Sequence, residues 1–371
     1  MVKVCHMTSV HKNNDARIFK KQCVSLASVG YDVTLVAHGH SFESNGVKIV
    51  GVPAVGGGRL RRMTRGAKSV YKKAIEIDAD IYHIHDPELL PYALKLKNKD
   101  KKVIFDSHEI YNLQILHKAY LPKVLRKIIA TVYDMYETKV CRKIDAVIVP
   151  CAVNGSNHFL NRAVQSALID NTPDLSEFYD KFDPTYLKKD AKICYLGGLT
   201  YERGITHLIK AADKAGAILV LGGIFSPERY FEQVKRLKEY RCVDYRGFLE
   251  KDGILEALKE SQIGVSVLLN KGQYHILDNL PTKVYEYMSM GLPVVISDCA
   301  HARKINDKYN CFILVPPDDI DQISTAIRYL IDNPEVAKAM GLNGRRAIAE
   351  EFNWSIEERK LIDLYKRLTE V

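Results

Sequence analysis

Short runs of hydrophobic, often β-branched residues alternate along this chain with longer stretches in which hydrophobic residues recur at helical spacing. In the first half, strands are expected at 2–8, 31–38, 47–53, 81–85, 102–108 and 145–150. The pattern then restarts, with strands expected at 191–198, 217–223, 243–249, 263–269, 293–298 and 311–317. Nearly continuous hydrophobic strands that alternate with helices predict α/β architecture with parallel sheets covered on both faces.

Helices are expected between these strands, and the first of them illustrates the pattern. In residues 16–30, Ile18, Cys23 and Leu26 follow helical spacing. Gly30 stands just before the next strand, where a glycine commonly ends a helix. The pattern therefore predicts a helix that stops at Gly30. A last helix is expected at 354–368, after the second sheet.

The chain is expected to form two Rossmann-like domains. Its 371 residues are too many for one ordinary core and suit two domains of roughly 150–200 residues each. The segment 169–190 has no strong period and contains two prolines, so we place the boundary there, between domains 1–170 and 171–354. Two such halves in tandem predict a ligand site at the carboxyl ends of their strands.

The formal charge of +9 favours anionic partners, namely phosphates, acidic lipid headgroups or nucleic acid. Positive residues gather in the first half, at 59–73, 95–102 and 123–130. Each cluster also fits an ordinary solvated helix face. Aromatic and basic residues do not interleave, and no zinc-finger or helix-turn-helix pattern occurs, so nucleic acid is the weaker choice.

Cysteine usage and hydrophobicity together predict a cytoplasmic protein. The eight cysteines are scattered without a C-x-x-C motif, which is typical of buried free thiols in a reducing compartment and makes a zinc site unlikely. No apolar run approaches the roughly 20 residues that span a bilayer. The N-terminus turns polar too early for a signal peptide and instead suggests a strand that leads into a loop.

The first loop after a strand argues against a dinucleotide cofactor. It reads HMTSVHKNNDARIF, which is polar and free of glycine. A dinucleotide pyrophosphate is normally held by G-x-G-x-x-G at this place, because glycines let the backbone approach the phosphates. We therefore expect no NAD or FAD in the first domain.

The segment 278–298, DNLPTKVYEYMSMGLPVVISD, carries the strongest chemical signal. Pro281 suits the first position of a helix. Free N–H groups of Thr282 and Lys283 at the helix start would form an anion site, to which Lys283 adds a full charge. Glu286 follows one turn later and can accept hydrogen bonds from ribose hydroxyls. The plainer alternative is that Lys283 and Glu286 form a surface pair.

This segment resembles the donor-binding motif of the family 4 retaining glycosyltransferases of the GT-B fold. In that motif two acids spaced E-x7-E flank a phosphate-binding loop and helix. Glu286 matches the second acid, and Asp278 replaces the first with a side chain one methylene shorter. The resemblance implies that Asp278, Leu280, Thr282 and Glu286 bind the donor sugar nucleotide.

A second match lies at 195–211, YLGGLTYERGITHLIKA, which resembles the family's G-R-L-x-x-x-K-G segment. Arg203 occupies the position of the phosphate-binding lysine and can hold a diphosphate with two parallel hydrogen bonds. Gly198 replaces the usual arginine, so Arg203 and Lys283 would carry more of the diphosphate charge. A solvated loop arginine is the alternative for Arg203. We expect the base to bind near Phe248, mainly through backbone groups.

The first domain resembles the family in its opening loop and in one strand end. The resemblance implies that Asp15 and Arg17 face the cleft and touch the acceptor or the donor phosphate. The segment 105–111, FDSHEIY, resembles the one that places a histidine beside the reacting sugar. His108 is the candidate, with Glu109 adjacent on the acceptor side. A histidine at a strand end is as often a structural residue.

Two further segments match the family without defining a role. In HIHDPELLP, three polar residues without an assigned function lie at the end of an expected strand, namely His85, Asp86 and Glu88. The tail FNWSIEERKLIDLYKRL resembles the family's final helix, which implies that residues 355–371 pack back on the first domain. The resemblance therefore covers the full length of the chain.

The predicted activity is transfer of a hexosyl or N-acetylhexosaminyl group from a nucleotide-diphosphate sugar to a saccharide or lipid-linked acceptor. The resemblance implies retention of anomeric configuration. The leaving diphosphate needs compensating positive charge, which we assign to Arg203 and Lys283, with His108 beside the sugar. The acid cluster 318–321 looks like a solvated loop, so we expect no metal and no cofactor.

The basic first half suits a role in surface polysaccharide or glycolipid synthesis, with peripheral contact to an anionic membrane. Two other classes fit the same two-domain plan. A sugar-nucleotide epimerase would need no acceptor, and a phosphorylase would need a pyridoxal-phosphate lysine that does not stand out. A non-catalytic bilobal binding protein of the periplasmic type is disfavoured by the missing export signal and the free cysteines.

Overall fold

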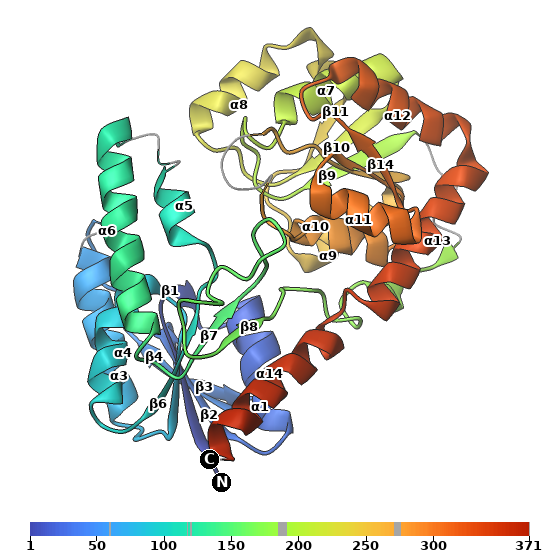
Figure 1. The fold of residues 1–371 in the computed structure, drawn as a ribbon. Coiled ribbons are helices and arrows are strands. Elements are labelled where there is room, and N and C mark those ends of the chain that lie inside the picture. The colour runs from blue at the N-terminus through green and yellow to red at the C-terminus, as the bar shows by residue number, and fades with distance from the viewer. Residues whose placement is uncertain (59–60, 117, 119–120, 185–190, 271–275, 371) are drawn as a thin grey trace. The chain divides into compact units, whose positions relative to one another are not determined.

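The computed structural model describes residues 1–370 apart from 59–60, 117, 119–120, 185–190 and 271–275. The chain divides into two compact units (Figure 1). Unit 1 comprises Met1–Asn171 and Ser355–Val371, and unit 2 comprises Thr172–Trp354. The chain thus passes from unit 1 to unit 2 after Asn171. The boundary expected from the sequence was after residue 170. Each unit has its own sheet.

Unit 1 contains, in its described residues, an eight-stranded sheet of order β3-β4-β2-β1-β5-β6-β7-β8. The strands are β1 (Lys3–Lys12), β2 (Asp32–His38), β3 (Phe42–Ser44), β4 (Val47–Val52), β5 (Ile81–Ile84), β6 (Lys102–Asp106), β7 (Ala146–Val149) and β8 (Ser166–Leu168). All neighbours pair in parallel except β3 with β4. The two unexpected strands, β3 and β8, are three-residue edge strands without a hydrophobic run.

The helices of unit 1 follow the alternating pattern. They are α1 (Val24–Ser28), α3 (Ala67–Ile75), α4 (Leu90–Lys97), α5 (Tyr111–Leu116), α6 (Lys123–Cys141) and α14 (Trp354–Thr369), with the π-helical segments η1 (Ala16–Cys23) and η2 (Arg62–Gly66) and the 3₁₀ turn η3 (Pro87–Leu89). The expected helix 16–30 is therefore η1 followed by α1. Gly30 follows it with φ of 93°, a conformation that favours glycine.

Unit 2 has a six-stranded sheet of order β11-β10-β9-β12-β13-β14 in its described residues, with every pair parallel. The strands are β9 (Lys192–Leu196), β10 (Ile218–Gly222), β11 (Val243–Tyr245), β12 (Ile263–Ser266), β13 (Val294–Ser297) and β14 (Phe312–Val315). The helices are α7 (Ile205–Ala215), α8 (Glu228–Lys235), α9 (Lys251–Glu260), α10 (Thr282–Ser289), α11 (Ala300–Tyr309), α12 (Ile320–Asp332) and α13 (Pro334–Glu350), with 3₁₀ turns η4 (Tyr179–Lys181) and η6 (Lys238–Cys242).

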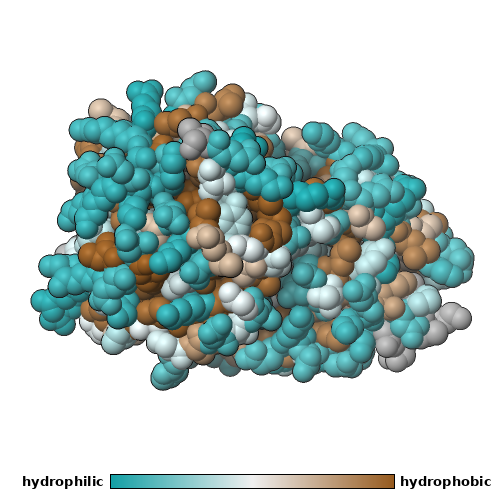
Figure 2. Space-filling view, turned by 90° about the horizontal axis from the view of Figure 1, so that it is seen from below, coloured by the Kyte–Doolittle hydropathy of each residue, from teal (hydrophilic) through white to brown (hydrophobic). Residues whose placement is uncertain are grey.

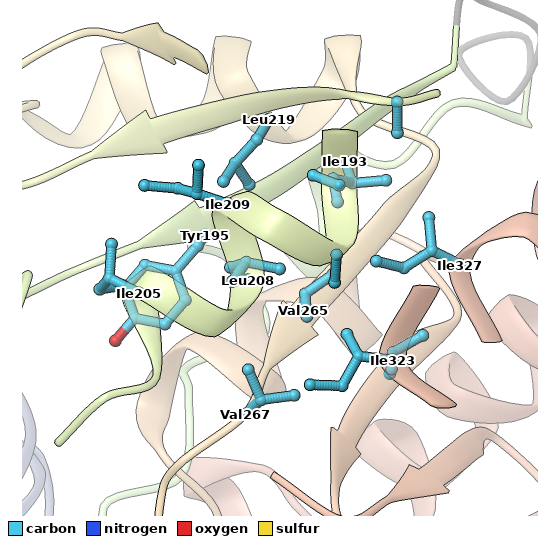
Figure 3. Close-up of a cluster of buried hydrophobic side chains, with 14 of the residues drawn as sticks. Ile193, Tyr195, Ile205, Leu208, Ile209, Leu219, Val265, Val267, Ile323 and Ile327 are labelled. Carbon is cyan, nitrogen blue, oxygen red and sulfur yellow. The ribbon is translucent and has the colours of Figure 1, made fainter. Parts of the chain in front are cut away.

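Hydrophobic clusters cover both faces of the unit 2 sheet. Successive residues of β9 alternate between them: Ile193 and Tyr195 belong to one cluster, Cys194 and Leu196 to the other. Figure 3 shows the first cluster, in which β9 lies among side chains of α7 and α12. This two-sided burial explains why the strands are nearly continuous hydrophobic runs. The predicted α/β class with parallel sheets is confirmed.

The acid cluster at 318–321 is solvated as predicted, but it stands at the start of α12 and only partly in a loop. Asp319 is the N-cap of α12, and its side chain accepts hydrogen bonds from the backbone N–H groups of Asp321 and Gln322 at 3.0 and 2.9 Å. Carboxylates near a helix start are stabilised by the unsatisfied N–H groups and by the helix dipole. Asp319 therefore has a local structural role as the cap of α12.

Hydrophilic residues predominate on the surface shown in Figure 2, whereas most of the cysteines are buried. Figure 2 shows a face on which hydrophilic residues predominate and hydrophobic residues appear in patches between them. All eight cysteines are free thiols, and most are buried. Burial raises the pKa of Cys194 to about 12, so this thiol stays protonated and unreactive at neutral pH. Among the described helices, none has both the length and the hydrophobicity that crossing a bilayer requires.

Candidate active site

A pocket of about 450 Å³ in unit 2 brings together six of the residues predicted from the sequence: Gly198, Arg203, Phe248, Thr282, Lys283 and Glu286. Its other lining residues are Leu196, Gly197, Gly222, Gly223, Ile224, Leu249 and Ile254. The walls follow the carboxyl ends of β9, β10 and β11 and include the start of α10. Open parallel sheets bind ligands at this end of their strands.

Glycines open the pocket floor between β9 and β10. Gly197 and Gly223 have φ of 125° and 143°, which other residues rarely adopt. A Cβ at Gly223 would lie 1.8 Å from the carbonyl oxygen of Gly197. A Cβ at Gly197 would lie 3.1 Å from Nζ of Lys283. Only glycine fits at both positions, and backbone groups therefore form this part of the wall.

Lys283 is a buried lysine in the wall of this pocket. The residue is 5% exposed, and its Nζ lies 3.5 Å from the centroid of the Tyr195 ring. Within the described residues, this Nζ has no hydrogen-bond partner. Burial and the charge of Arg203 lower the pKa of Lys283 well below its usual value, and Glu286 opposes this shift. A buried positive charge without a hydrogen-bond partner costs free energy, so an anion bound beside Lys283 would be stabilising.

The start of α10 adds further positive potential to the pocket. Thr282 and Lys283 are its first two residues, and neither N–H can have an intrahelical partner there. Pro281 precedes the helix as N-cap with ψ of 138°, so the prediction that it occupies the first helical position was wrong by one residue. The helix dipole points its positive end at the same place.

Two residues predicted to bind the donor are outside the lining of this pocket. Leu280 is 3% exposed and belongs to the hydrophobic core beneath α10. Its apolar side chain is buried there and anchors the loop. Asp278 is half-buried, and its charge acts on His301, whose pKa burial lowers and Asp278 raises. Neither side chain lines the pocket of unit 2.

A second cluster of polar residues lies in unit 1 around the buried Asp106 at the end of β6. Asp106 accepts hydrogen bonds from Nε and an Nη of Arg17, both at 3.0 Å, and from Nε2 of Gln22 at 2.6 Å. Burial alone would raise its pKa, but the charge of Arg17 holds that pKa well below the usual range. Asp106 is therefore an ionised anchor that no solvent screens.

His108 is held by a row of buried histidines. Its Nε2 lies 3.1 Å from Nδ1 of His85, and Nε2 of His85 lies 2.9 Å from Nδ1 of His6. The hydroxyl of Tyr365 on α14 lies 2.9 Å from Nδ1 of His83 and 3.4 Å from Nε2 of His6. Burial lowers the pKa of His108, which favours its neutral form. Helix α14 thus contributes Tyr365 to the hydrogen-bonded row of side chains that holds His108.

The other unit 1 residues predicted to face substrate have structural partners. Arg17 was expected to face the cleft and touch the acceptor or the donor phosphate, but it is 6% exposed and is bound to Asp106 and to the carbonyl of Ile169. Asp15 caps η1 through the N–H groups of Arg17 and Ile18 and pairs with His11 at 3.2 Å. Glu109 is exposed and accepts a hydrogen bond from Gln114.

The three residues of HIHDPELLP that the sequence left without a role, His85, Asp86 and Glu88, are now placed. His85 belongs to the histidine row. Asp86 is 1% exposed and accepts hydrogen bonds from the hydroxyl of Thr8 at 2.8 Å and from the N–H of Ser9 at 2.6 Å. Glu88 lies in η3, at the turn into α4. Asp86, just after β5, therefore holds β1 at Thr8 and Ser9.

Three groups of described residues have the spacing to hold a metal ion: His6, His83 and His85; His85, Asp106 and His108; and Asp134, Glu137 and His158. In the first two groups, both ring nitrogens of His6 and His85 already have hydrogen-bond partners. In the third, Arg162 lies 3.0 Å from Asp134 and 3.1 Å from Glu137. Internal hydrogen bonds and ion pairs thus account for these groupings.

Sequence reasoning missed several residues of both sites. The prediction from FDSHEIY named His108 and overlooked Asp106 two residues before it, although a carboxylate at the end of a buried strand is itself a signal. Tyr195 under Lys283 was counted only as a strand residue. Gly197, Gly222 and Gly223 were also missed, although glycines at or directly after the end of a strand indicate close backbone approach.

Two protein-family models and several known proteins match this chain. Residues 17–154 match the model described as Glycosyltransferase Family 4, and residues 178–347 match the model for Glycosyl transferases group 1. An uncharacterized glycosyltransferase of Methanocaldococcus jannaschii is 25% identical over 294 residues, which are 74% of this chain and 70% of the relative.

Solved structures show the same fold along the whole chain. The sucrose-phosphate synthase of Thermosynechococcus elongatus has a TM-score of 0.78 at 17% identity, with 99% of each chain covered. The Anabaena protein HepE, solved in complex with UDP and glucose, has a TM-score of 0.71 at 12% identity and covers 99% of this chain and 100% of its own. The chain therefore belongs to the family 4 glycosyltransferases and has their GT-B fold.

Proposed function

We propose that this glycosyltransferase binds a nucleotide-diphosphate sugar in the pocket of unit 2 and transfers the sugar, with retention of configuration, to a saccharide or lipid-linked acceptor. The observation that carries the proposal is the buried Nζ of Lys283. It has no hydrogen-bond partner among the described residues and lies beside Arg203 at the start of α10. A diphosphate supplies the anion that this arrangement lacks. The Anabaena neighbour was solved with UDP and glucose, which supports this ligand class.

The leaving diphosphate gains negative charge in the transition state, and preorganised cations lower the barrier most where that charge develops. We assign this task to Lys283, Arg203 and the N–H groups at the start of α10. These two side chains would supply the charge that a metal ion supplies in other transferases. Glu286, one turn along α10, would accept hydrogen bonds from the ribose hydroxyls. Phe248 is 66% exposed and would border the base.

In unit 1, we assign to His108 the positioning of the donor sugar, as the family resemblance implies. Its neutral form can donate a hydrogen bond to a sugar hydroxyl from one ring nitrogen while the other stays paired with His85. Retention is compatible with a front-face route in which the leaving phosphate helps to deprotonate the acceptor. No enzyme nucleophile is assigned.

We further propose that the acceptor belongs to surface polysaccharide or glycolipid synthesis and is reached at an anionic membrane. The basic segments of unit 1 support this, since cationic side chains are attracted to acidic headgroups. Both the transferred group, of hexosyl or N-acetylhexosaminyl type, and the acceptor follow from the resemblance and are part of the proposal.

A thermal-shift screen against UDP, GDP and ADP sugars tests the donor class. One nucleotide series should raise the unfolding temperature, because a ligand that binds only the folded state stabilises it. Incubation of that donor without an acceptor distinguishes a glycosyltransferase from a sugar-nucleotide epimerase. Conversion of the donor to its epimer in that incubation would contradict the proposal and favour an epimerase.

Glu286→Gln should weaken donor binding by roughly 10- to 100-fold, because a hydrogen bond to a charged group contributes about 1.5–3 kcal/mol. The effect should appear in KM for the donor more than in kcat, since the ribose contact is present before and during transfer. Glu256→Gln, on the exposed side of α9, is the matched control. An unchanged donor KM in Glu286→Gln would remove the ribose assignment.

A further inference from the structure

One face of α6 exposes an unusual number of large hydrophobic side chains. The helix is anchored to unit 1 beside α4 and α5 (Figure 1) through the buried residues Ala130, Glu137, Val140 and Cys141. Seven large hydrophobic residues are exposed, and we call them the α6 stripe: Val124 (72% exposed), Leu125 (45%), Ile128 (54%), Ile129 (37%), Val132 (61%), Met135 (67%) and Tyr136 (37%).

Helical geometry makes these residues a continuous band. Val124, Ile128, Val132 and Met135 are spaced by three or four residues and so lie along one side of the helix. Leu125, Ile129 and Tyr136 lie along the adjacent side. Single exposed hydrophobic residues are ordinary, whereas a contiguous exposed band marks a surface that binds something apolar.

The charges around the α6 stripe define its partner. Lys123, Lys127 and Lys139 are exposed on the same helix. Its two acids, Asp134 and Glu137, are both paired with Arg162, at 3.0 and 3.1 Å. The first three turns of α6 therefore combine hydrophobic and cationic residues without an acid. This combination complements an anionic bilayer, where the hydrophobic face enters the boundary of the acyl chains and lysines reach the headgroups.

We propose that the α6 stripe inserts into the interfacial layer of a membrane that contains anionic lipid. The helix lies in the plane of the membrane and does not cross it. The inference deepens the proposed function, on which its purpose rests: it names the element that brings the enzyme to a lipid-linked acceptor. The surface itself is independent of the donor pocket in unit 2.

Co-sedimentation of the full chain with phosphatidylcholine–phosphatidylglycerol vesicles, without nucleotide sugar, tests the proposal. The double variant Ile128→Glu/Val132→Glu should bind at least about tenfold more weakly than the unchanged chain. Tyr329→Glu/Leu342→Glu replaces residues that are 47% and 43% exposed on α12 and α13, and it should bind vesicles normally. Pure phosphatidylcholine vesicles should bind the unchanged chain less tightly than anionic ones do.

Two further readouts keep this test separate from the donor proposal. Both double variants should keep the nucleotide-induced thermal shift and the unfolding temperature, because the changed side chains are exposed. Lys283→Ala should lose the nucleotide shift and still bind vesicles. Equal vesicle binding by Ile128→Glu/Val132→Glu and the unchanged chain would overturn the inference. So would an unchanged chain that ignores vesicles and forms a dimer which the variant abolishes, since the stripe would then be a self-association surface.

Discussion

Lys283→Ala is expected to lower turnover with the preferred nucleotide sugar by roughly two to three orders of magnitude, the range found when one preorganised donor to a developing anion is removed. The side chain is buried and lacks a hydrogen-bond partner among the described residues, so its charge is directed to a ligand and its loss breaks no internal hydrogen bond. Steady-state kinetics with a saturating acceptor measure the effect, and circular dichroism should show an unchanged fold.

Lys338→Ala is the matched control, because this lysine is exposed on α13 and is outside the pocket lining. It should leave kcat and the donor KM unchanged. Arg203→Ala should resemble Lys283→Ala in direction, since both cations line the same pocket. Near-normal turnover in both variants would refute the assignment of the diphosphate site.

The same lysine should make nucleotide affinity depend on pH. In the free protein, burial and Arg203 lower the pKa of Lys283, and a bound diphosphate raises it again. Affinity should therefore be complete below the free-protein pKa and fall as pH rises through it, before an ordinary lysine would lose its proton near pH 10.4, its approximate reference pKa. Calorimetric titration of UDP across this range measures the effect. An identical pH profile in Lys283→Ala would contradict it.

Asp106→Ala is expected to destabilise unit 1 by about 3–5 kcal/mol, the cost of leaving one partner of a buried ion pair uncompensated. Arg17 is 6% exposed and loses both of its hydrogen bonds to this carboxylate, as Gln22 loses one. Turnover should fall as well, because Asp106 also lies 3.6 Å from His85 and 3.7 Å from His108.

Hydrogen exchange measured by mass spectrometry locates this effect, because a two-unit protein need not unfold in one step. Peptides of β1 and β6 should lose protection, while those of β9 and β10 keep it. Asp332→Ala removes an exposed pair with Arg328 and should cost at most about 1 kcal/mol. If Asp106→Ala is no more destabilising than this control, the ionised-anchor interpretation fails.

Much of the fold could be predicted from the sequence because its signals are local. Each of the twelve expected strands corresponds to a strand of the structure, since two-sided burial imposes hydrophobic runs that neighbouring residues already display. The anion site at Thr282 and Lys283 was likewise readable. A helix start exposes its N–H groups whatever the rest of the chain does. The structure then places Lys283 in one pocket with Arg203, Phe248 and Glu286.

The tertiary structure decided what depends on residues far apart in the chain. Arg17 was expected to touch the acceptor or the donor phosphate and is instead bound to Asp106 in a buried anchor, and Leu280 was expected to contact the donor and is instead a core residue. The segment 123–130 looked like one basic cluster among several, and only burial showed that α6 turns its hydrophobic side outward. Local patterns set the helices and strands, but packing chooses which face is covered and which charges meet, because those contacts form only after distant segments come together.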